Sequence, residues 1–293
     1  MSLASTEFVH LHVHSEYSLA DGLFKVKDLV NRAAAGGMPA VALTDRNNLF
    51  ALVKFFEACM GQGVKPIMGA EVLVQETSQD SAERVLLLAR DLQGYRNLLA
   101  LISASYTTTA QRGVLREQEI FAAKSGLIVL SGGVRGHLWS LLNNGDLAQA
   151  EERAKRWQGE FGDAYYLEVT RCGRADEEQN LRHLLAIAAS TGIGVVATND
   201  VCFAEADDFE AHETRVCIHE GRTLNDGRRE RRYSERQYLR SPQEMAELFQ
   251  DVPSALANAV EIAKRCNVEV ALGTYYLPDY PIPDQQTPEQ YLL

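Results

Sequence analysis

The feature that most constrains this chain is the segment Phe8–Gly22, FVHLHVHSEYSLADG, in which histidine alternates with apolar residues. In a β-strand successive side chains point to opposite faces, so His10, His12 and His14 would share one face. Neutral imidazole is a good ligand for zinc, manganese or iron. Asp21 follows on a turn that is placed to fold back over the strand end. The segment therefore predicts a metal site at the end of a strand.

Strand and helix patterns alternate along most of the chain. Short apolar runs predict strands at 8–14, 40–45, 65–75, 85–90, 126–133, 165–170 and 195–200. Helical spacing predicts helices at 26–35, 49–60, 95–107, near 117, 147–161 and 175–191. Such alternation predicts parallel strands with right-handed crossovers. Seven strands within about 200 residues favour a closed or nearly closed barrel over an open sheet.

Beyond residue 207 the strand patterns stop. Helical patterns at 209–220 and 253–265 are expected to pack across the barrel. The end, YYLPDYPIPDQQTPEQYLL, is rich in proline, which is typical of a linker. Because the sequence stops where a helix would begin, we interpret the chain as part of a longer protein.

The charge of the chain restricts its partners. The formal net charge is −11, which argues against general affinity for nucleic acid because phosphate binding depends on basic surface. The local exception is the run GRTLNDGRRERRY, interpreted as a solvated loop or as a contact to DNA or to another part of a larger polypeptide. Its arginines are Arg222, Arg228, Arg229, Arg231 and Arg232.

Composition also indicates the compartment. No window reaches the roughly 18 apolar residues of a membrane span, and the start, MSLASTEF, lacks a secretory signal. Five cysteines without a CxxC pair indicate reduced thiols rather than a disulfide scaffold. We therefore expect a cytoplasmic protein with no membrane association.

The motif HLHVHSEYSLADG resembles the opening motif of the polymerase and histidinol phosphatase (PHP) superfamily. The segments TDRNNL and VVATND are similar in sequence to segments of the N-terminal PHP domains of bacterial DNA polymerase III α subunits. The resemblance covers residues 5–280 and implies an α/β fold, a distorted (β/α)7 TIM-like barrel with extra C-terminal helices. It divides the chain into a PHP domain at 5–270 and a Pro-rich exit linker at 271–293 toward further polymerase domains.

The resemblance also implies a pocket for several divalent metals, and this chain has only part of it. The matching ligand positions are His12, His14, Asp21, Glu71 and Asp200. The departures from the family pattern are Arg46, Arg84, Gly133 and Cys202. Glycine has no ligand atom and arginine is permanently cationic, whereas a cysteine thiolate can still ligate a metal. Two-metal hydrolysis needs ions about 3.5–4 Å apart, so we expect no ion or a single Zn²⁺ or Mn²⁺.

The missing metals leave carboxylates without a cation. Asp21, Glu71 and Asp200 would converge on the old pocket, where like charges repel one another and cost stability. An arginine carries a fixed charge and five donors in a planar fork that suits carboxylates. We therefore expect Arg46, with Arg84 beside it, to replace a metal electrostatically through ion pairs.

The resemblance implies that the full-length protein is a DNA-directed DNA polymerase that uses Mg²⁺ and acts on DNA within a replicase holoenzyme. A degenerate PHP domain of this kind would be a scaffold that docks the proofreading exonuclease subunit. One alternative is a weak metal-dependent phosphoesterase, a 3′–5′ exonuclease or pyrophosphatase, with one ion on His12, His14, Asp200 and Cys202. Another is a free-standing enzyme similar to histidinol phosphatase.

Overall fold

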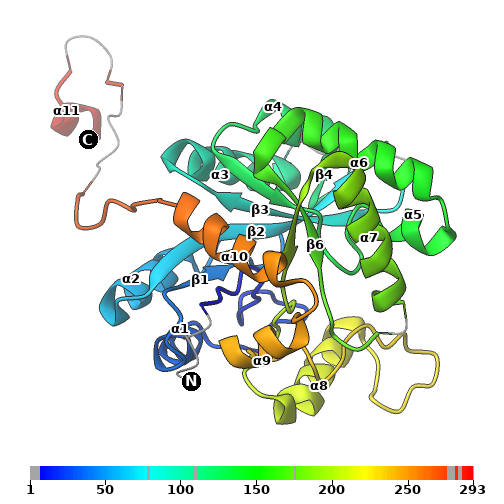
Figure 1. The fold of residues 1–293 in the computed structure, drawn as a ribbon. Helices are drawn as coiled ribbons and strands as arrows, with labels where there is room; N and C mark the ends of the chain where they lie inside the picture. Colours follow the sequence, from blue (N-terminus) through cyan, green and yellow to red (C-terminus); the bar gives the residue numbers. More distant parts are fainter. Residues whose placement is uncertain are drawn as a thin grey trace.

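A computed structural model describes residues 7–77, 80–107, 111–174, 176–275, 281–282 and 286–292, and it shows an α/β structure around one curled sheet (Figure 1). The strands pair in the order β1-β2-β3-β5-β6-β7, with β4 beside β2. Part of the predicted 271–293 linker therefore lies outside the described residues. The strands are β1 Ala40–Leu43, β2 Lys65–Gln75, β3 Glu83–Ala89, β4 Val114–Arg116, β5 Leu127–Leu130, β6 Tyr165–Val169 and β7 Gly194–Ala197.

The N-terminal segment 8–14 joins the two edges of this sheet. It makes one isolated bridge, between Val13 and Val201, rather than the continuous strand that the alternation predicted. On one side the Ala42 N–H donates to the His10 carbonyl at 2.9 Å, and on the other the Val201 N–H donates to the His12 carbonyl at 3.0 Å. The segment thus lies between β1 and the chain that leaves β7. The predicted distorted TIM-like barrel is confirmed.

The prediction that all strands are parallel is wrong for β3, which runs antiparallel to both β2 and β5. β2 ends at Gln75 and β3 begins at Glu83. A parallel crossover needs a dozen or more residues, so this short connection returns the chain in the opposite direction. The sequence also missed β4, whose three residues are too few to show a periodic pattern.

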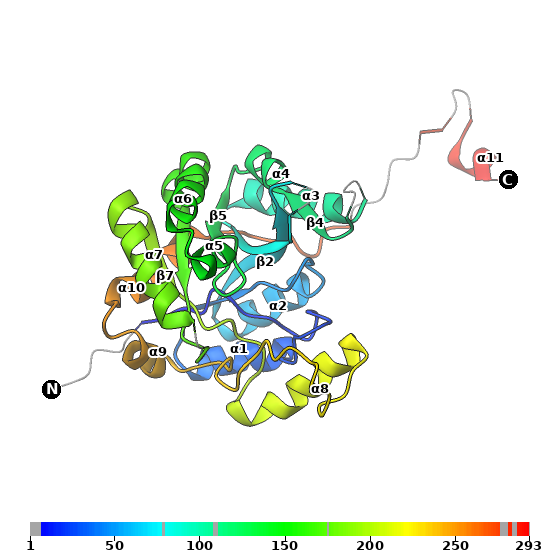
Figure 2. The same ribbon diagram turned by 90° about the vertical axis from the view of Figure 1, so that its right-hand side faces the viewer.

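The helices cover the outside of the sheet. α1 packs on β1, α2 on β2, α3 on β3, α7 on β6 and α10 on β7. In Figure 2, α3, α4 and α6 lie above β2, and α1 and α8 lie below it. The helices are α1 Val26–Ala35, α2 Leu52–Gln62, α3 Leu92–Thr107, α4 Glu117–Ala122, α5 Trp139–Asn144, α6 Leu147–Phe161, α7 Glu177–Thr191, α8 Phe209–Glu220, α9 Pro242–Leu248, α10 Pro253–Arg265 and α11 Pro288–Leu292.

The sequence predicted the bounds of α1, α6, α8 and α10 but missed α9. The signal for α9 is present as a capping box, since the Ser241 hydroxyl accepts from the Glu244 N–H and the Glu244 carboxylate accepts from the Ser241 N–H. Pro242 at the first helical position adds to this signal. The extra C-terminal helices of the predicted fold are therefore α8, α9 and α10.

All five cysteines are buried and carry free thiols, as the absence of paired motifs predicted. Among the helices of the described residues, none has the length and apolar character that a membrane crossing requires.

Candidate metal centre

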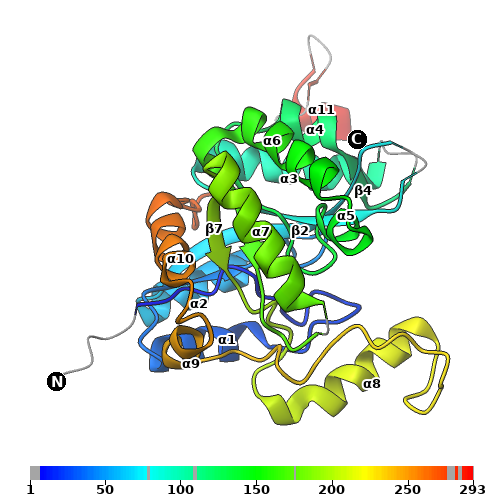
Figure 3. The ribbon, with the colours of Figure 1, turned by 45° about the vertical axis from the view of Figure 1, so that its right-hand side comes forward.

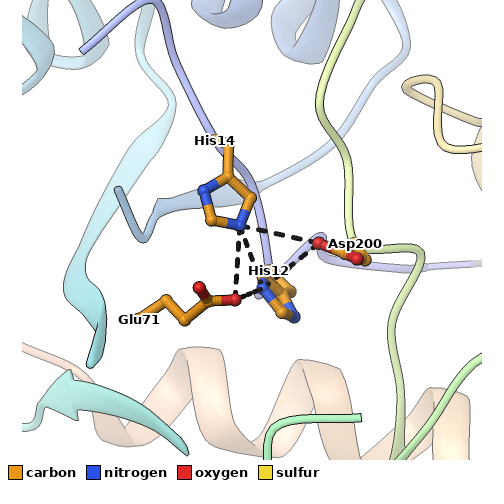
Figure 4. A group of neighbouring side chains, drawn as sticks. All are labelled: His12, His14, Glu71 and Asp200. Carbon is orange, nitrogen blue, oxygen red and sulfur yellow. Dashed lines mark hydrogen bonds and ion pairs between the residues drawn. The ribbon is translucent and has the colours of Figure 1, made fainter. Parts of the chain in front are cut away.

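Four side chains from distant parts of the chain meet at one end of the barrel (Figure 4). His12 and His14 come from the N-terminal segment, Glu71 from the middle of β2, and Asp200 from the chain after β7. Their donor atoms all lie within 4.8 Å of one another, and all four residues are buried. The two histidines share a face because they are two residues apart in extended chain. We call these four side chains the cage.

The separations between the cage atoms suit a single tetrahedral ion. The His12 Nε2 lies 3.2 Å from the His14 Nε2, 3.3 Å from the Glu71 Oε2 and 3.4 Å from the Asp200 Oδ1. The His14 Nε2 lies 3.5 Å from the same Asp200 oxygen and 3.7 Å from the same Glu71 oxygen. Bonds of about 2.0–2.1 Å to a tetrahedral zinc place ligand atoms roughly 3.3–3.4 Å apart. The cage therefore fits one such ion.

Further contacts fix the tautomers of the two histidines. The His12 Nδ1 donates to the Glu168 Oε1 at 2.7 Å, and the His14 Nδ1 donates to the Ser18 Oγ at 2.9 Å. The Ser18 hydroxyl in turn donates to the Asp45 Oδ1 at 2.7 Å. Each imidazole therefore presents its Nε2 to the cage, which is the usual arrangement of metal-binding histidines.

The sequence reasoning missed Glu168, which is fully buried on β6. Besides His12, its carboxylate accepts from the Thr198 hydroxyl at 2.5 Å and from the Gly132 N–H at 3.0 Å. The signal was the run YYLEVT, because a charged residue inside a buried apolar strand needs a partner. Glu168 holds the His12 ring in place.

Arg46 lies across the pocket between two carboxylates. Its Nε is 2.5 Å from the Glu71 Oε1 and its Nη1 is 2.6 Å from the Asp21 Oδ2. The Arg84 Nη1 approaches the other oxygen of Glu71 at 3.2 Å. Asp21 is drawn toward Arg46 and is not among the cage side chains. A fixed cation therefore stands beside the cage.

The turn that carries Asp21 depends on a glycine. A Cβ at Gly22 would lie 1.7 Å from the Ser15 carbonyl oxygen, so no other residue fits this close approach. The ring of Tyr233 returns over the turn, and its hydroxyl donates to the Asp21 Oδ2 at 2.5 Å. The sequence gave no signal for this contact, because Tyr233 is more than two hundred residues along the chain from Asp21.

Asp200 has one oxygen held and one free. The Gln237 amide donates to its Oδ2 at 2.8 Å. Its Oδ1 is buried without a hydrogen-bond partner and faces the two imidazoles. The residue has φ 43, a left-handed conformation that aspartate tolerates better than most residues. An orphaned buried oxygen of this kind is what a cation or a proton would satisfy.

The structure does not bring Cys202 or Gly133 into the cage. The Cys202 thiol donates to the Asp200 carbonyl at 3.5 Å, and burial raises the pKa of this thiol well above its usual value. A thiol of this kind is a poor source of the thiolate that metals bind. Gly133 lies near Glu168, which occupies the space where a longer side chain would extend.

Positive charge from the protein itself offsets the carboxylates of the pocket. Burial by itself lowers the pKa of His12, but Glu168 and Asp200 outweigh burial and raise it to about 10. Burial is likewise outweighed at His14, where the nearby carboxylates of Asp200 and Glu71 raise the pKa to about 9. The carboxylates thus favour a protonated imidazole beside Arg46 and Arg84, and an entering metal would displace the imidazole proton.

Arginine charges also keep the carboxylates ionised. Burial favours protonation of Glu71, but Arg46 and Arg84 hold its pKa well below the usual value. Arg46 likewise outweighs burial at Asp21 and lowers the pKa of that carboxyl. Neither carboxylate therefore needs a metal to remain charged.

The chain combines a curled α/β barrel with a cage of histidine and carboxylate side chains at one end. The family model described as "PHP domain" matches residues 10–172. The chain belongs to the PHP domain family.

The chain also resembles particular proteins. It is 48% identical to the DNA polymerase III subunit alpha of Pseudomonas fluorescens over 287 residues, which are 97% of this chain and 24% of that protein. It is 48% identical to the DNA polymerase III subunit alpha of Escherichia coli K12, in an alignment that covers 99% of this chain and 25% of that protein. The chain spans about a quarter of the length of these relatives.

Solved structures with a similar course of the chain are more distant. One is an amidohydrolase from Chromobacterium violaceum, with a TM-score of 0.46 and 14% identity over 71% of this chain and 96% of that one. Another is a two-domain protein from Bacteroides vulgatus containing a predicted PHP-like metal-dependent phosphoesterase. Its TM-score is 0.42, with 13% identity over 89% of this chain and 69% of that one. Because the identity and the TM-score are this low, neither structure is used to interpret the residues of the cage.

Proposed function

We propose that the chain is the PHP domain of a bacterial DNA polymerase III α subunit and that this domain serves as a scaffold. The full-length protein would be a DNA-directed DNA polymerase that uses Mg²⁺ and acts on DNA within a cytoplasmic replicase holoenzyme. The support is 48% identity to two such subunits along nearly the whole chain. The same relatives give no support to a free-standing phosphatase similar to histidinol phosphatase.

The observation that carries the scaffold role is the position of Arg46. Two-metal hydrolysis requires a second cation about 3.5–4 Å from the first. Arg46 instead bridges Asp21 and Glu71, and Arg84 reaches the second oxygen of Glu71. An arginine is not a Lewis acid and is not deprotonated in proteins, so it cannot generate hydroxide from a bound water. The pocket therefore keeps the charge of a metal and loses its chemistry.

A single ion still fits, held by His12, His14, Glu71 and Asp200. When bound, Zn²⁺ or Mn²⁺ supplies a Lewis acid. Four protein ligands around one tetrahedral ion leave no open position, which is the pattern of a structural site rather than a catalytic one. Such an ion would strengthen the end of the barrel, as the arginine pairs already do. We assign it a structural role.

We also propose that the domain binds the proofreading exonuclease subunit. A chain of net charge −11 is poorly suited to be a general DNA-binding surface. In this proposal the protein partner docks on the outside of the barrel and does not need the cage. Co-purification of the two proteins should survive a chelator. Loss of the partner on addition of EDTA would show that binding depends on a metal. Absence of any complex would contradict the proposed docking role.

One metal analysis tests the scaffold proposal. The chain purified without a chelator should contain at most one Zn²⁺ or Mn²⁺ per molecule. The chain is also assayed with added Mn²⁺, Zn²⁺ or Mg²⁺ for release of nucleotides from the 3′ ends of single-stranded DNA and for release of phosphate from pyrophosphate. Neither activity should exceed that of the His12→Ala variant. Robust turnover that disappears in His12→Ala would contradict the scaffold role. Nucleotide incorporation by this chain alone would contradict the assignment of polymerase activity to the remainder of the protein.

A second candidate function has one observation in its favour. If Glu71 stays paired with Arg46 and Arg84, then an ion has only His12, His14 and the free Asp200 oxygen as ligands. Three protein ligands leave an open position, as in catalytic zinc sites. The domain would then be a weak single-metal phosphoesterase. Weak activity that is lost in His12→Ala and kept in Glu71→Gln would favour this candidate.

A further inference from the structure

The chain that follows α8 returns to the barrel beside the chain that leaves β7. In Figure 3, α8 and the loop after it stand out from the barrel before the chain returns toward α9. We call residues 233–239 the strap. The Cys202 N–H donates to the Gln237 carbonyl at 2.9 Å, and the Leu239 N–H donates to the Phe203 carbonyl at 3.2 Å. The strap is therefore joined to the chain after β7 by backbone hydrogen bonds.

The N-terminal segment holds the same stretch of chain on its other side. The Val201 N–H donates to the His12 carbonyl at 3.0 Å, and the His14 N–H donates to the Val201 carbonyl at 2.8 Å. The stretch 200–203 thus lies between the segment that carries the two cage histidines and the strap. Asp200, the first residue of this stretch, is therefore positioned by both neighbours.

Gln237 makes the side-chain contacts that fix Asp200. Its side chain is fully buried. Its Nε2 donates to the Asp200 backbone carbonyl at 3.1 Å and to the Asp200 Oδ2 at 2.8 Å, while its Oε1 accepts from the Ser234 N–H at 3.0 Å. An amide turned by 180° would place oxygen against two oxygens and its NH₂ group against the Ser234 N–H. Only one orientation therefore satisfies all three contacts, and it directs both amide protons at Asp200.

These contacts hold Asp200 in an unfavourable backbone conformation. Its φ is 43, and a left-handed residue other than glycine persists only where its surroundings hold it. With the carbonyl and the Oδ2 bound to Gln237, the Oδ1 faces the Nε2 atoms of His12 and His14 at 3.4 and 3.5 Å. The aim of this cage oxygen therefore depends on a residue of the strap.

We propose that Gln237 is a positioning residue of the cage and that it couples the strap to metal occupancy. The inference rests on the single-ion site of the proposed function. Partners that orient a metal ligand typically change metal affinity by about 10–100-fold. Such coupling is reciprocal, so a bound ion lowers the opening of the strap by the factor by which the closed strap raises metal affinity. The cage thereby controls how often a segment with exposed residues, Glu235 and Arg236, opens.

The test combines zinc affinity, measured against a competing chelator, with amide hydrogen exchange at Cys202 and Leu239, measured by NMR in EDTA and in saturating zinc. Both amides donate to backbone carbonyls, which no variant removes. In the wild type, zinc should slow these two amides by about 10–100-fold. Gln237→Met keeps the length of the side chain and removes both donors. It should lower zinc affinity by the same factor, and zinc should no longer slow the two amides.

The matched control is Ser234→Ala, which removes the hydrogen bond from the strap to the Cys172 carbonyl and keeps the Gln237 amide. It should speed exchange in the strap without lowering zinc affinity, because Asp200 stays bound to Gln237 in the closed state. Gln237→Glu is a second variant, which keeps an acceptor for the Ser234 N–H and replaces the donors by a charged acceptor. It should lose zinc affinity at least as strongly as Gln237→Met, and circular dichroism verifies the fold of each variant.

Four results would overturn the proposal. They are wild-type affinity in both Gln237 variants, an equal loss of affinity in Ser234→Ala, equal slowing by zinc in the wild type and in Gln237→Met, and absence of zinc binding by the wild type. The last result leaves the scaffold role intact, because that role allows a cage without an ion. Hydrolysis of DNA or pyrophosphate would contradict the scaffold role and would leave the coupling unaffected.

Discussion

The Nε of Arg46 lies 2.5 Å from the Oε1 of Glu71, in a pair in which Glu71 is fully buried and Arg46 is 18% exposed. A metal ion can be removed by a chelator, but a guanidinium remains part of the chain. The pair therefore gives this end of the barrel a permanent cation, and its energetic role can be measured without any control over metal content.

Replacing Arg46 by alanine should destabilise the metal-free protein by about 3–5 kcal/mol, because it removes the guanidinium that bridges two buried carboxylates, Asp21 and Glu71, and leaves Asp21 without an ion-pair partner. Denaturant unfolding in the presence of EDTA measures this loss. The matched variant is Arg228→Ala, whose side chain is 85% exposed beside Asp226 and should leave stability almost unchanged. A loss below about 1 kcal/mol for Arg46→Ala would show that the ion pairs contribute little.

The second prediction is that Asp200 is a metal ligand and Cys202 is not. Asp200→Asn should lower the zinc content of the purified chain at least tenfold, since its free Oδ1 faces both imidazoles. Cys202→Ala should leave zinc content unchanged, because burial keeps this thiol protonated. Elemental analysis after dialysis against buffered zinc gives both values. If Cys202→Ala loses zinc as Asp200→Asn does, then the thiol is a ligand after all.

The third prediction concerns the residue that orients His12. Glu168→Gln keeps the shape of the side chain but cannot accept the His12 Nδ1 proton as a charged group. Partners of this kind typically change metal affinity by about 10–100-fold. Zinc affinity measured against a competing chelator should fall by that factor. Glu178→Gln, an exposed carboxylate on α7 that pairs with Arg171, is the control and should not change it. An unchanged affinity in Glu168→Gln would mean that packing alone orients the ring.

The sequence predicted the parts of this site that depend on strand periodicity. His12 and His14 alternate in extended chain, whereas Glu71 and Asp200 were expected from the resemblance to PHP domains, and the structure brings all four together. Arg46 was expected among carboxylates because it stands where a ligand would stand, and it does contact Asp21 and Glu71.

The rest depends on contacts between segments that no local pattern connects. Tyr233 and Gln237 reach the cage from a strap after α8, and nothing in their surroundings indicates which carboxylate they contact. Cys202 was expected as a possible ligand because of its place in the sequence. Its thiol donates instead to the backbone carbonyl of Asp200, and a two-residue spacing cannot reveal that direction.

The last prediction is a pH dependence that comes from outside the cage. His137 is fully buried, its Nε2 contacts the Tyr165 hydroxyl at 2.9 Å, and burial, with Arg153 nearby, keeps its pKa well below 6.5. The folded protein therefore keeps this imidazole neutral, whereas the unfolded chain protonates it below about pH 6.5. Folding stability from this residue is present above pH 6.5 and is lost on acidification, by about 1.4 kcal/mol per pH unit.

The measurement is urea unfolding of the wild type and of His137→Gln at pH 7, 6 and 5. The wild type should lose about 2 kcal/mol more than His137→Gln between pH 7 and pH 5, because only the wild-type unfolded chain takes up this proton. His10 and His212, whose burial lowers their pKa to about 4, and the raised His12 and His14 affect both proteins equally. His219→Gln, at an exposed position of α8, should follow the wild-type curve. Parallel curves for wild type and His137→Gln would mean that His137 is protonated in the folded state.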